Sequence, residues 1–107
     1  MTETEKFKAF LEWRNEKLKA FQDHLVQEEL WRDVAVDIYN KERTKLTSLK
    51  EERAGKEAVD EQRGHVAGAK MGAFLAKVAY LRAADNYEIA QSYFDQIHFQ
   101  KEQDGDE

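Results

Sequence analysis

Apolar residues recur every seven positions along most of this chain. In the first half the spacing, or twice it, connects Leu11, Leu18, Leu25, Tyr39 and Leu46. The complementary heptad position holds Phe21, Ala35 and Leu49. In the second half the same spacing connects Val59, Val66, Ala73, Tyr80, Tyr87 and Phe94. A repeat of this period is typical of helices that bury one stripe, and the chain contains no proline, so we predict an all-α fold.

Local signals divide this helical region. Thr2 and Glu5 have the spacing of a capping box, which predicts a helix that begins almost at the first residue. Gly55 is the best C-terminal cap of the first half, because glycine tolerates the left-handed conformation that ends helices. After it, Asp85 with Glu88 resembles a second cap, so we expect one helix to end at Ala84 and another to run from Asn86 to about residue 100.

The first half could also be interrupted, softly near residues 27–29 or near 44–48, where Ser48 and Glu51 could form a capping box. An unbroken helix over residues 3–53 would be about 75 Å long. Polar residues also occupy heptad positions that favour apolar ones, which argues against a regular coiled coil; they are Arg14, Glu28, Arg32 and Glu42. Further apolar residues widen the stripe, namely Trp13, Leu30, Trp31, Val34 and Ile38.

These features predict an elongated helical hairpin or a small bundle of two to four helices, completed by oligomerisation. We expect a single helical domain over residues 1–100. Residues 101–107 form an acidic, glycine-containing segment that we expect to be a mobile tail.

Small residues at intervals of four form the most unusual feature of the second half. They are Gly64, Gly68, Gly72 and Ala76. On a helix this spacing produces a ridge without side chains, and each glycine costs about 0.8 to 1 kcal/mol relative to alanine. Close packing of another helix, from this chain or from another subunit, would restore that free energy. The alternative is direct contact of a ligand or of a nucleic-acid backbone with the glycines. An apolar arc continues the ridge and completes one predicted packing face; it consists of Ala67, Met71, Phe74, Leu75 and Val78.

A basic strip borders that arc. Arg63, Lys70 and Lys77 are seven residues apart, and residues 64–84 contain no Asp or Glu. The simplest interpretation is a solvated edge whose long stems cover apolar surface. The alternative is a contact for an acidic partner or for phosphates.

Composition limits the classes of function. The 107 residues carry a formal net charge of −5, which argues against a general binder of nucleic acid or of membrane surfaces. No run approaches the roughly 18 apolar residues of a spanning helix, and the first residues do not resemble a targeting signal. Without cysteine there is no disulfide framework and no thiolate site, and we expect a cytoplasmic protein.

Signals for catalysis or for metal binding are weak. The histidines have carboxylates at helical spacing, as in His24 with Glu28, but no Glu-x-x-His pair of a di-iron bundle occurs. Ser48 and Ser92 lie in helical stretches without a nucleophile elbow or a phosphate loop. We therefore expect no enzymatic activity, no metal and no cofactor.

One stretch of the chain resembles a known group of proteins. It begins with Trp31, continues through Leu46, Leu49 and the charged run at 51–53, and ends with Arg63-Gly64 followed by Val66, Gly68 and an apolar helix. Over residues 31–81 it resembles small helical proteins of tailed bacteriophages and prophages, which are often encoded beside head-assembly genes. The resemblance implies a virion component, an assembly factor or a host-takeover protein, in the host cytoplasm or the virion, and it assigns no catalytic residue.

The sequence thus favours a non-enzymatic helical protein that acts through protein–protein assembly, as a homo-oligomer or with a protein partner. It also predicts that Gly68→Leu disrupts folding or assembly. One alternative is a small inhibitor of a host enzyme or defence complex whose acidic surface mimics nucleic acid. The other is a nucleic-acid binder that uses the basic strip, which the overall charge makes unlikely.

Overall fold

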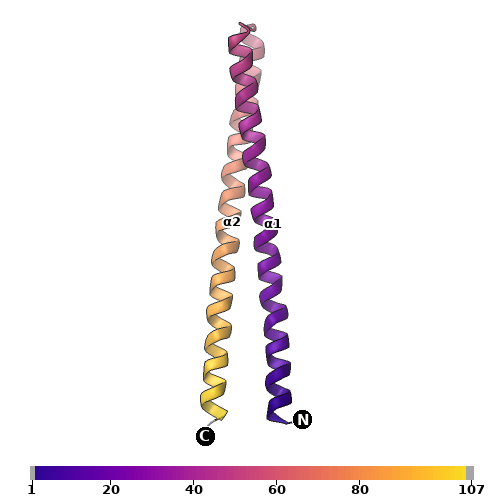
Figure 1. Cartoon of the computed structure of the whole chain (residues 1–107). Helices are drawn as coiled ribbons and strands as arrows, with labels where there is room; N and C mark the ends of the chain where they lie inside the picture. The colour runs from indigo at the N-terminus through magenta and orange to yellow at the C-terminus, as the bar shows by residue number, and fades with distance from the viewer. Residues whose placement is uncertain (1, 106–107) are drawn as a thin grey trace. The chain divides into compact units, whose positions relative to one another are not determined.

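The computed structural model describes the backbone of residues 2–105 and the side chains of residues 2–97. It consists of two α-helices, α1 (Glu3–Glu51) and α2 (Lys56–Gly105), and the described residues contain no strand. Figure 1 shows the two helices joined by one tight turn. The all-α class and the helical hairpin are therefore confirmed.

The start of α1 is the predicted capping box. The Thr2 hydroxyl accepts a hydrogen bond from the Glu5 amide at 3.1 Å, and the Thr2 amide donates to the Glu5 carboxylate at 3.2 Å. Two amide donors that the first turn would leave unpaired are thereby satisfied.

The turn between the helices differs from the prediction at Gly55. The left-handed residue is Arg53, with φ of 56°, whereas Gly55 does not have a positive φ. The Arg53 amide donates to the Lys50 carbonyl, and the Ala54 amide donates to the Leu49 carbonyl, which is the hydrogen-bond pattern of a Schellman motif. Gly55 instead caps the next helix, since its carbonyl accepts from the Val59 amide.

Neither helix has the predicted interruptions. Residues 27–29 and 44–48 lie inside α1, and residues 84–86 lie inside α2. No proline forces a break at these places, and the hydroxyls of Thr44 and Thr47 donate to carbonyls four residues earlier, within the helix. The backbone of residues 101–105 belongs to α2, while the side chains of the predicted tail and residues 106–107 lie outside the described part.

The chain divides into two compact units. Unit 1 comprises residues 1–26 and 82–107, and unit 2 comprises residues 27–81, which include the turn. Each unit contains one segment of α1 and one segment of α2, so each is described by itself below.

The two helices of unit 2 meet along a regular heptad seam. On α1 the half-buried seam residues are Glu28, Arg32, Ala35, Tyr39, Glu42, Leu46 and Leu49. On α2 the buried and half-buried seam residues are Val59, Gln62, Val66, Ala69, Ala73, Ala76 and Tyr80. This regularity corrects our interpretation that polar heptad residues rule out a coiled-coil seam. The alanines of α2 leave room for the larger side chains of α1.

Partners on the opposite helix explain how the seam of unit 2 accommodates polar residues. Gln62 is only 3% exposed, and its amide donates to both the carboxylate and the backbone carbonyl of Glu42. The Arg32 guanidinium lies over the Tyr80 ring, 4.3 Å from its centroid. Buried polar groups thus keep hydrogen-bond or cation–π partners.

Unit 1 has a seam of the same kind. Its half-buried or buried residues are Phe7, Leu11, Arg14, Leu18 and Leu25 on α1 and Ala83, Tyr87, Ala90, Phe94 and Ile97 on α2. Trp13 packs edge-on against Phe94, with ring centroids 5.3 Å apart, and Arg14 forms an ion pair with Asp95.

Candidate functional site

The seam of unit 2 has two flanks of opposite character. The seam residues of each helix alternate between two heptad positions, one that includes Ala35 and Ala76 and one that includes Arg32 and Ala73. In an antiparallel helix pair, the residues directly after the first position lie on one side of the seam in both helices, and the residues directly before the second position lie on the opposite side. We name the first side the polar flank: Glu29, Val36 and Arg43 of α1 with Arg63, Lys70 and Lys77 of α2. We name the second side, together with the residues three positions further on, the apolar flank: Trp31, Val34 and Ile38 of α1 with Gly68, Gly72, Leu75 and Ala79 of α2.

A shallow groove confirms that the polar flank contains residues of both helices. Val36 of α1 and Lys77 of α2 line it together, along with Arg32, Asp33, Asp37, Asn40, Tyr80 and Leu81. The hydrogen bonds that the Arg32 guanidinium donates to Asp33, together with the charges of Asp33 and its neighbours, raise the pKa of Arg32 against a smaller opposing effect of burial. The groove therefore contains a permanent cation beside two carboxylates, a mixed charge that fits the solvated-edge interpretation.

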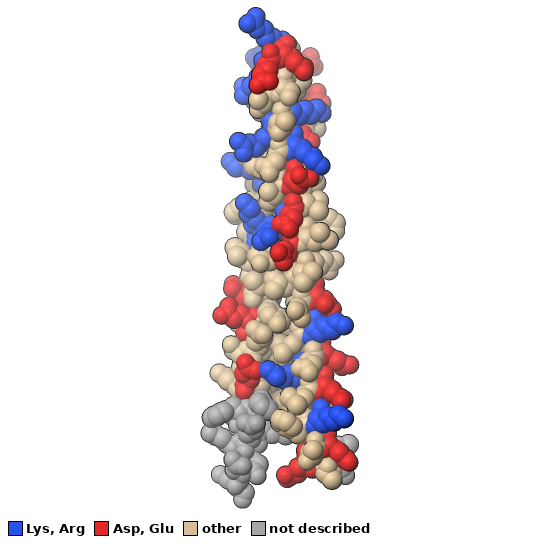
Figure 2. Space-filling model, in the orientation of Figure 1, with Lys and Arg blue, Asp and Glu red and all other residues tan. Residues whose placement is uncertain are grey.

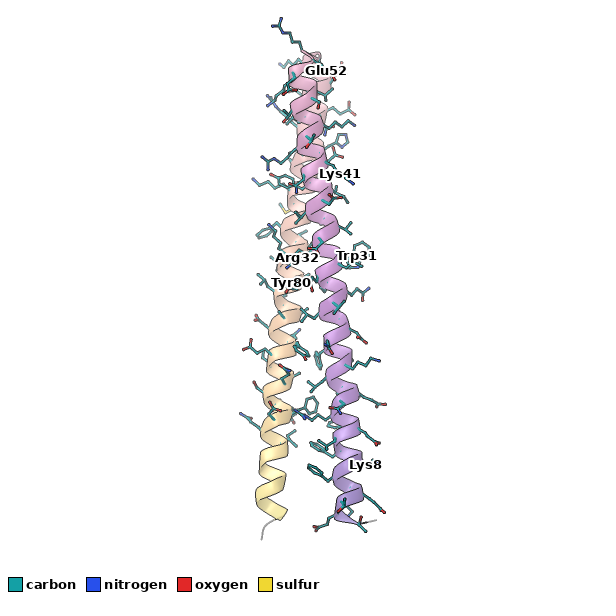
Figure 3. The ribbon with its side chains drawn as sticks, in the orientation of Figure 1. Lys8, Trp31, Arg32, Lys41, Glu52 and Tyr80 are labelled. Carbon is teal, nitrogen blue, oxygen red and sulfur yellow. The ribbon has the colours of Figure 1, made fainter. Side chains whose placement is uncertain are left out.

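The large side chains of the apolar flank remain exposed. Trp31 is 57% exposed, Ile38 48% and Leu75 57%. In Figure 3 the Trp31 ring projects outward from α1, whereas Arg32 and Tyr80 lie close to each other. Two further exposed side chains, Leu30 and Met71, border the flank on the outward faces of the helices. The face drawn in Figure 2 includes a tan zone that contains no Lys, Arg, Asp or Glu.

Scattered exposed apolar residues are normal in proteins, but a contiguous apolar patch marks an interaction surface. Residues 64–81 of α2 include only Lys70, Lys77 and His65 as polar side chains, so this stretch is apolar on its outward side as well as at the seam. Helices that are apolar all round are usually covered on all sides. The outward side of this stretch is uncovered in the single chain.

The glycines of the predicted ridge open onto empty space. A Cβ atom built at Gly64, Gly68 or Gly72 would meet no other atom within 4 Å. Within the described residues, neither helix therefore packs against the three glycines. For them, packing against a helix of another molecule remains as a prediction. Ala76, the last member of the ridge, lies in the seam instead.

The structure distributes the other predicted packing residues over three sides of α2. Gly68, Gly72 and Leu75 lie on the apolar flank, whereas Gly64, Met71 and Val78 occupy the outward face. By its heptad position Phe74 lies toward the polar flank. A single flat partner can therefore cover only some of them.

The basic strip is where the sequence predicts it. Arg63, Lys70 and Lys77 are all exposed along the polar flank, and Arg63 forms an ion pair with Asp60 at 3.5 Å. Within the described part of the chain, Lys70 and Lys77 have no ion pair and no hydrogen bond.

Sequence reasoning did not assign the α1 half of the apolar flank. It noted Trp31, Val34 and Ile38 as a widened stripe, without assigning them to a contact surface. Their own spacing of three and four residues is a second heptad pattern, displaced from the seam by one position. That displaced pattern is the signal that would have identified them.

Unit 1 exposes apolar side chains as well. A largely apolar groove in it is lined by Phe21, Asn86, Ile89, Ala90, Tyr93 and Phe94. Trp13 is 45% exposed and Tyr93 59%, so aromatic side chains extend to the surface of this unit.

The described residues contain no group of three or more His, Asp or Glu side chains that could hold a metal ion, and in that part of the chain neither helix has a stretch apolar enough to cross a membrane.

Comparison with known proteins found no relative: no protein-family model matches the chain, and no curated protein or solved structure matches it either.

Proposed function

We propose that this protein acts through protein–protein assembly, and that the apolar flank of unit 2 is the surface through which it associates. One observation carries this proposal: the two flanks of the same seam differ, one being charged and the other exposing Trp31, Ile38 and Leu75. A helix pair that functions alone needs polar residues on both flanks. Aromatic and aliphatic side chains that converge beside small residues are typical of the centre of an interface.

The glycines support the same proposal. Gly68 and Gly72 weaken α2 relative to alanine, and they gain no contact within the chain. A contact outside the chain is the simplest physical reason for them.

The distribution of charge favours assembly over mimicry of nucleic acid. A mimic presents unmixed acidic surface, whereas Asp33, Asp37 and Asp60 each pair with a neighbouring Arg or Lys. Red and blue atoms are interspersed on the face drawn in Figure 2. The acidic carboxylates beside Lys77 likewise disfavour a phosphate contact on the basic strip.

The resemblance to small helical phage proteins supplies a biological setting. We propose that the chain is a structural or assembly component of a phage, without enzymatic activity. Mass spectrometry of purified particles and of assembly intermediates tests this part. Detection in either is expected, and absence from both would contradict it.

The proposed surface is tested by photocrosslinking in cells that express the gene natively. A photoreactive amino acid replaces Leu75 in one variant and Leu81 in the other. The two leucines are 57% and 60% exposed on the same helix, but Leu81 lines the groove of the polar flank. We expect a discrete protein adduct from position 75 and none from position 81, and equal yields from both, or none from either, would contradict the proposal.

A further inference from the structure

Unit 2 carries a protruding half and a notched half on one flank. The α1 half presents Trp31, Val34 and Ile38, whereas the α2 half presents Gly68 and Gly72, where a Cβ would meet nothing within 4 Å. Both halves face the same side of the seam. A surface of this kind can accept a rotated copy of itself, since the bulk of one copy enters the notch of the other.

We propose that the occupant of the apolar flank is a second copy of this chain, packed about a two-fold axis so that four helical segments form one bundle. This inference rests on the proposed function and names its partner. In a two-fold interface each residue contact occurs twice, so the surface must be self-complementary in shape and in charge.

The shape requirement is met by side chains of known size. Arg32 lies beside Tyr80 and Glu42 beside Gln62, so Ile38 is level with Gly68 and Gly72, and Trp31 is level with Ala79. About a two-fold axis parallel to the helices, Ile38 of one copy therefore faces the glycines of the other, and Trp31 faces Ala79. Residues with a spacing of four form the ridges and grooves through which helices pack, and the absence of side chains at Gly68 and Gly72 deepens one such groove.

The charge requirement is met because the centre of the flank is uncharged. Lys70 and Lys77 lie on the polar flank, and no Asp or Glu occurs between residues 64 and 84. Two copies therefore meet without like charges at the centre, while Lys41, Lys45, Glu61 and His65 lie toward one end of the flank, near the turn, where His65 is within 3.8 Å of the Glu61 carboxylate. An uncharged centre with a polar rim is the usual anatomy of a protein interface.

The exposed area is sufficient for a dimer. Six large side chains on or beside the flank retain between 41% and 62% of their surface: Leu30, Trp31, Val34, Ile38, Met71 and Leu75. With the glycine backbone between them they offer roughly 600 to 800 Å² per chain, close to the ~800 Å² per partner of a standard stable interface.

Sedimentation equilibrium of the full chain, from about 1 µM to about 100 µM, tests this inference. We expect a monomer–dimer equilibrium between the mass of one chain, 12.5 kDa, and twice that mass. Leu75→Glu places one carboxylate from each copy in the apolar contact, and we expect it to raise the dissociation constant of the dimer by about 100-fold or more. Leu81→Glu is the matched control, and we expect it to leave the dimer within about three-fold.

Circular dichroism of both variants shows whether each keeps its helices, because both sites are exposed in the single chain. If Leu75→Glu unfolds, Leu75→Gln supplies a milder change, with weakening of about ten-fold or more expected. A monomer at every concentration would overturn the inference, and so would equal effects of the two glutamates.

A second measurement fixes the geometry. The chain has no cysteine, so a disulfide can form only between introduced thiols. An equimolar mixture of Val34→Cys and Gly72→Cys should yield the mixed disulfide in excess over a mixture of Asn40→Cys and Leu81→Cys, which lie on the polar flank. No excess would overturn the two-fold arrangement.

The two proposals fail in different ways. A monomer in solution, combined with a position-75 adduct to a different protein in cells, overturns the second copy and leaves the interaction surface intact. A monomer without any adduct overturns both.

Discussion

The glycines of the apolar flank allow folding and association to be separated by a single methyl group. In the isolated chain a Cβ at Gly68 or Gly72 meets nothing within 4 Å, so alanine brings only its higher helix propensity. Each substitution should stabilise the isolated chain by about 0.8 to 1 kcal/mol, and Gly68→Ala/Gly72→Ala together by about 1.6 to 2 kcal/mol. That gain corresponds to roughly a 15- to 30-fold shift of the folding equilibrium.

In the dimer the same methyl groups lie in the notch that receives Ile38. Overpacking of a close contact typically costs about 1 to 3 kcal/mol, and each added methyl group occurs twice in a two-fold dimer, once in each copy. We therefore expect Gly68→Ala/Gly72→Ala to raise the stability of the single chain and to weaken its association. The two effects have opposite signs.

Urea unfolding measures the first effect in a Leu75→Glu background, which keeps the chain monomeric. Sedimentation equilibrium measures the second effect in the otherwise unchanged chain. Gly64→Ala is the matched control, since its site is equally open but lies on the outward face of α2. It should stabilise the chain by about 0.8 to 1 kcal/mol, the gain of one substitution, and leave association unchanged. If the double variant associates as tightly as the natural chain, the notch has no role in assembly. If it destabilises the monomer, the space around the glycines is not open.

Two further predictions concern the hairpin itself. Arg53→Gly removes a side chain from a left-handed residue and should raise the free energy of unfolding by about 1 kcal/mol, measured by thermal or urea unfolding; a loss would show that the arginine side chain stabilises the turn. Glu42→Leu removes the carboxylate partner of buried Gln62 and should lower stability by about 1 to 2 kcal/mol, whereas Glu42→Leu/Gln62→Leu should regain most of that loss. A double-mutant cycle measures the coupling, and strictly additive effects would contradict a polar contact across the seam.

The sequence predicts the helical class and the hairpin because the heptad repeat and the Thr2 capping box are local patterns. It does not predict the regularity of the seam, because the polar heptad residues depend on partners far along the chain. Glu42 meets Gln62, and Arg14 meets Asp95, across 20 and 81 residues. Within the sequence of one helix, such polar residues only interrupt the apolar heptad pattern.

The helix ends illustrate a second limit. Gly55 and Arg53 are two residues apart, and both ends of the turn can use a glycine, so propensity alone does not decide which residue adopts the left-handed conformation. The hydrogen bonds of Ala54 and Arg53 to the last turn of α1 decide it. Asp85 likewise has the composition of a cap, but without proline or glycine beside it the helix continues through it.

The candidate surface was partly predictable. The glycine spacing identifies the α2 half, but the same arc of apolar residues turns out to span three sides of the helix once the seam is fixed. Only the position of the seam shows that Leu75 lies on the apolar flank and Phe74 toward the polar flank. Likewise, only the seam shows that Trp31 and Gly72 lie on the same flank.

The most direct test of a covered apolar flank uses Trp31 as its own reporter. The chain has two tryptophans, so Trp13→Phe leaves Trp31 as the single one. In the single chain Trp31 is 57% exposed, and a soluble quencher reaches it freely. The account predicts that, as the protein concentration rises through the dimer transition, quenching falls and emission shifts to shorter wavelength, and that Leu75→Glu abolishes both changes. Quenching that stays the same at every concentration, while the protein remains folded, would contradict it.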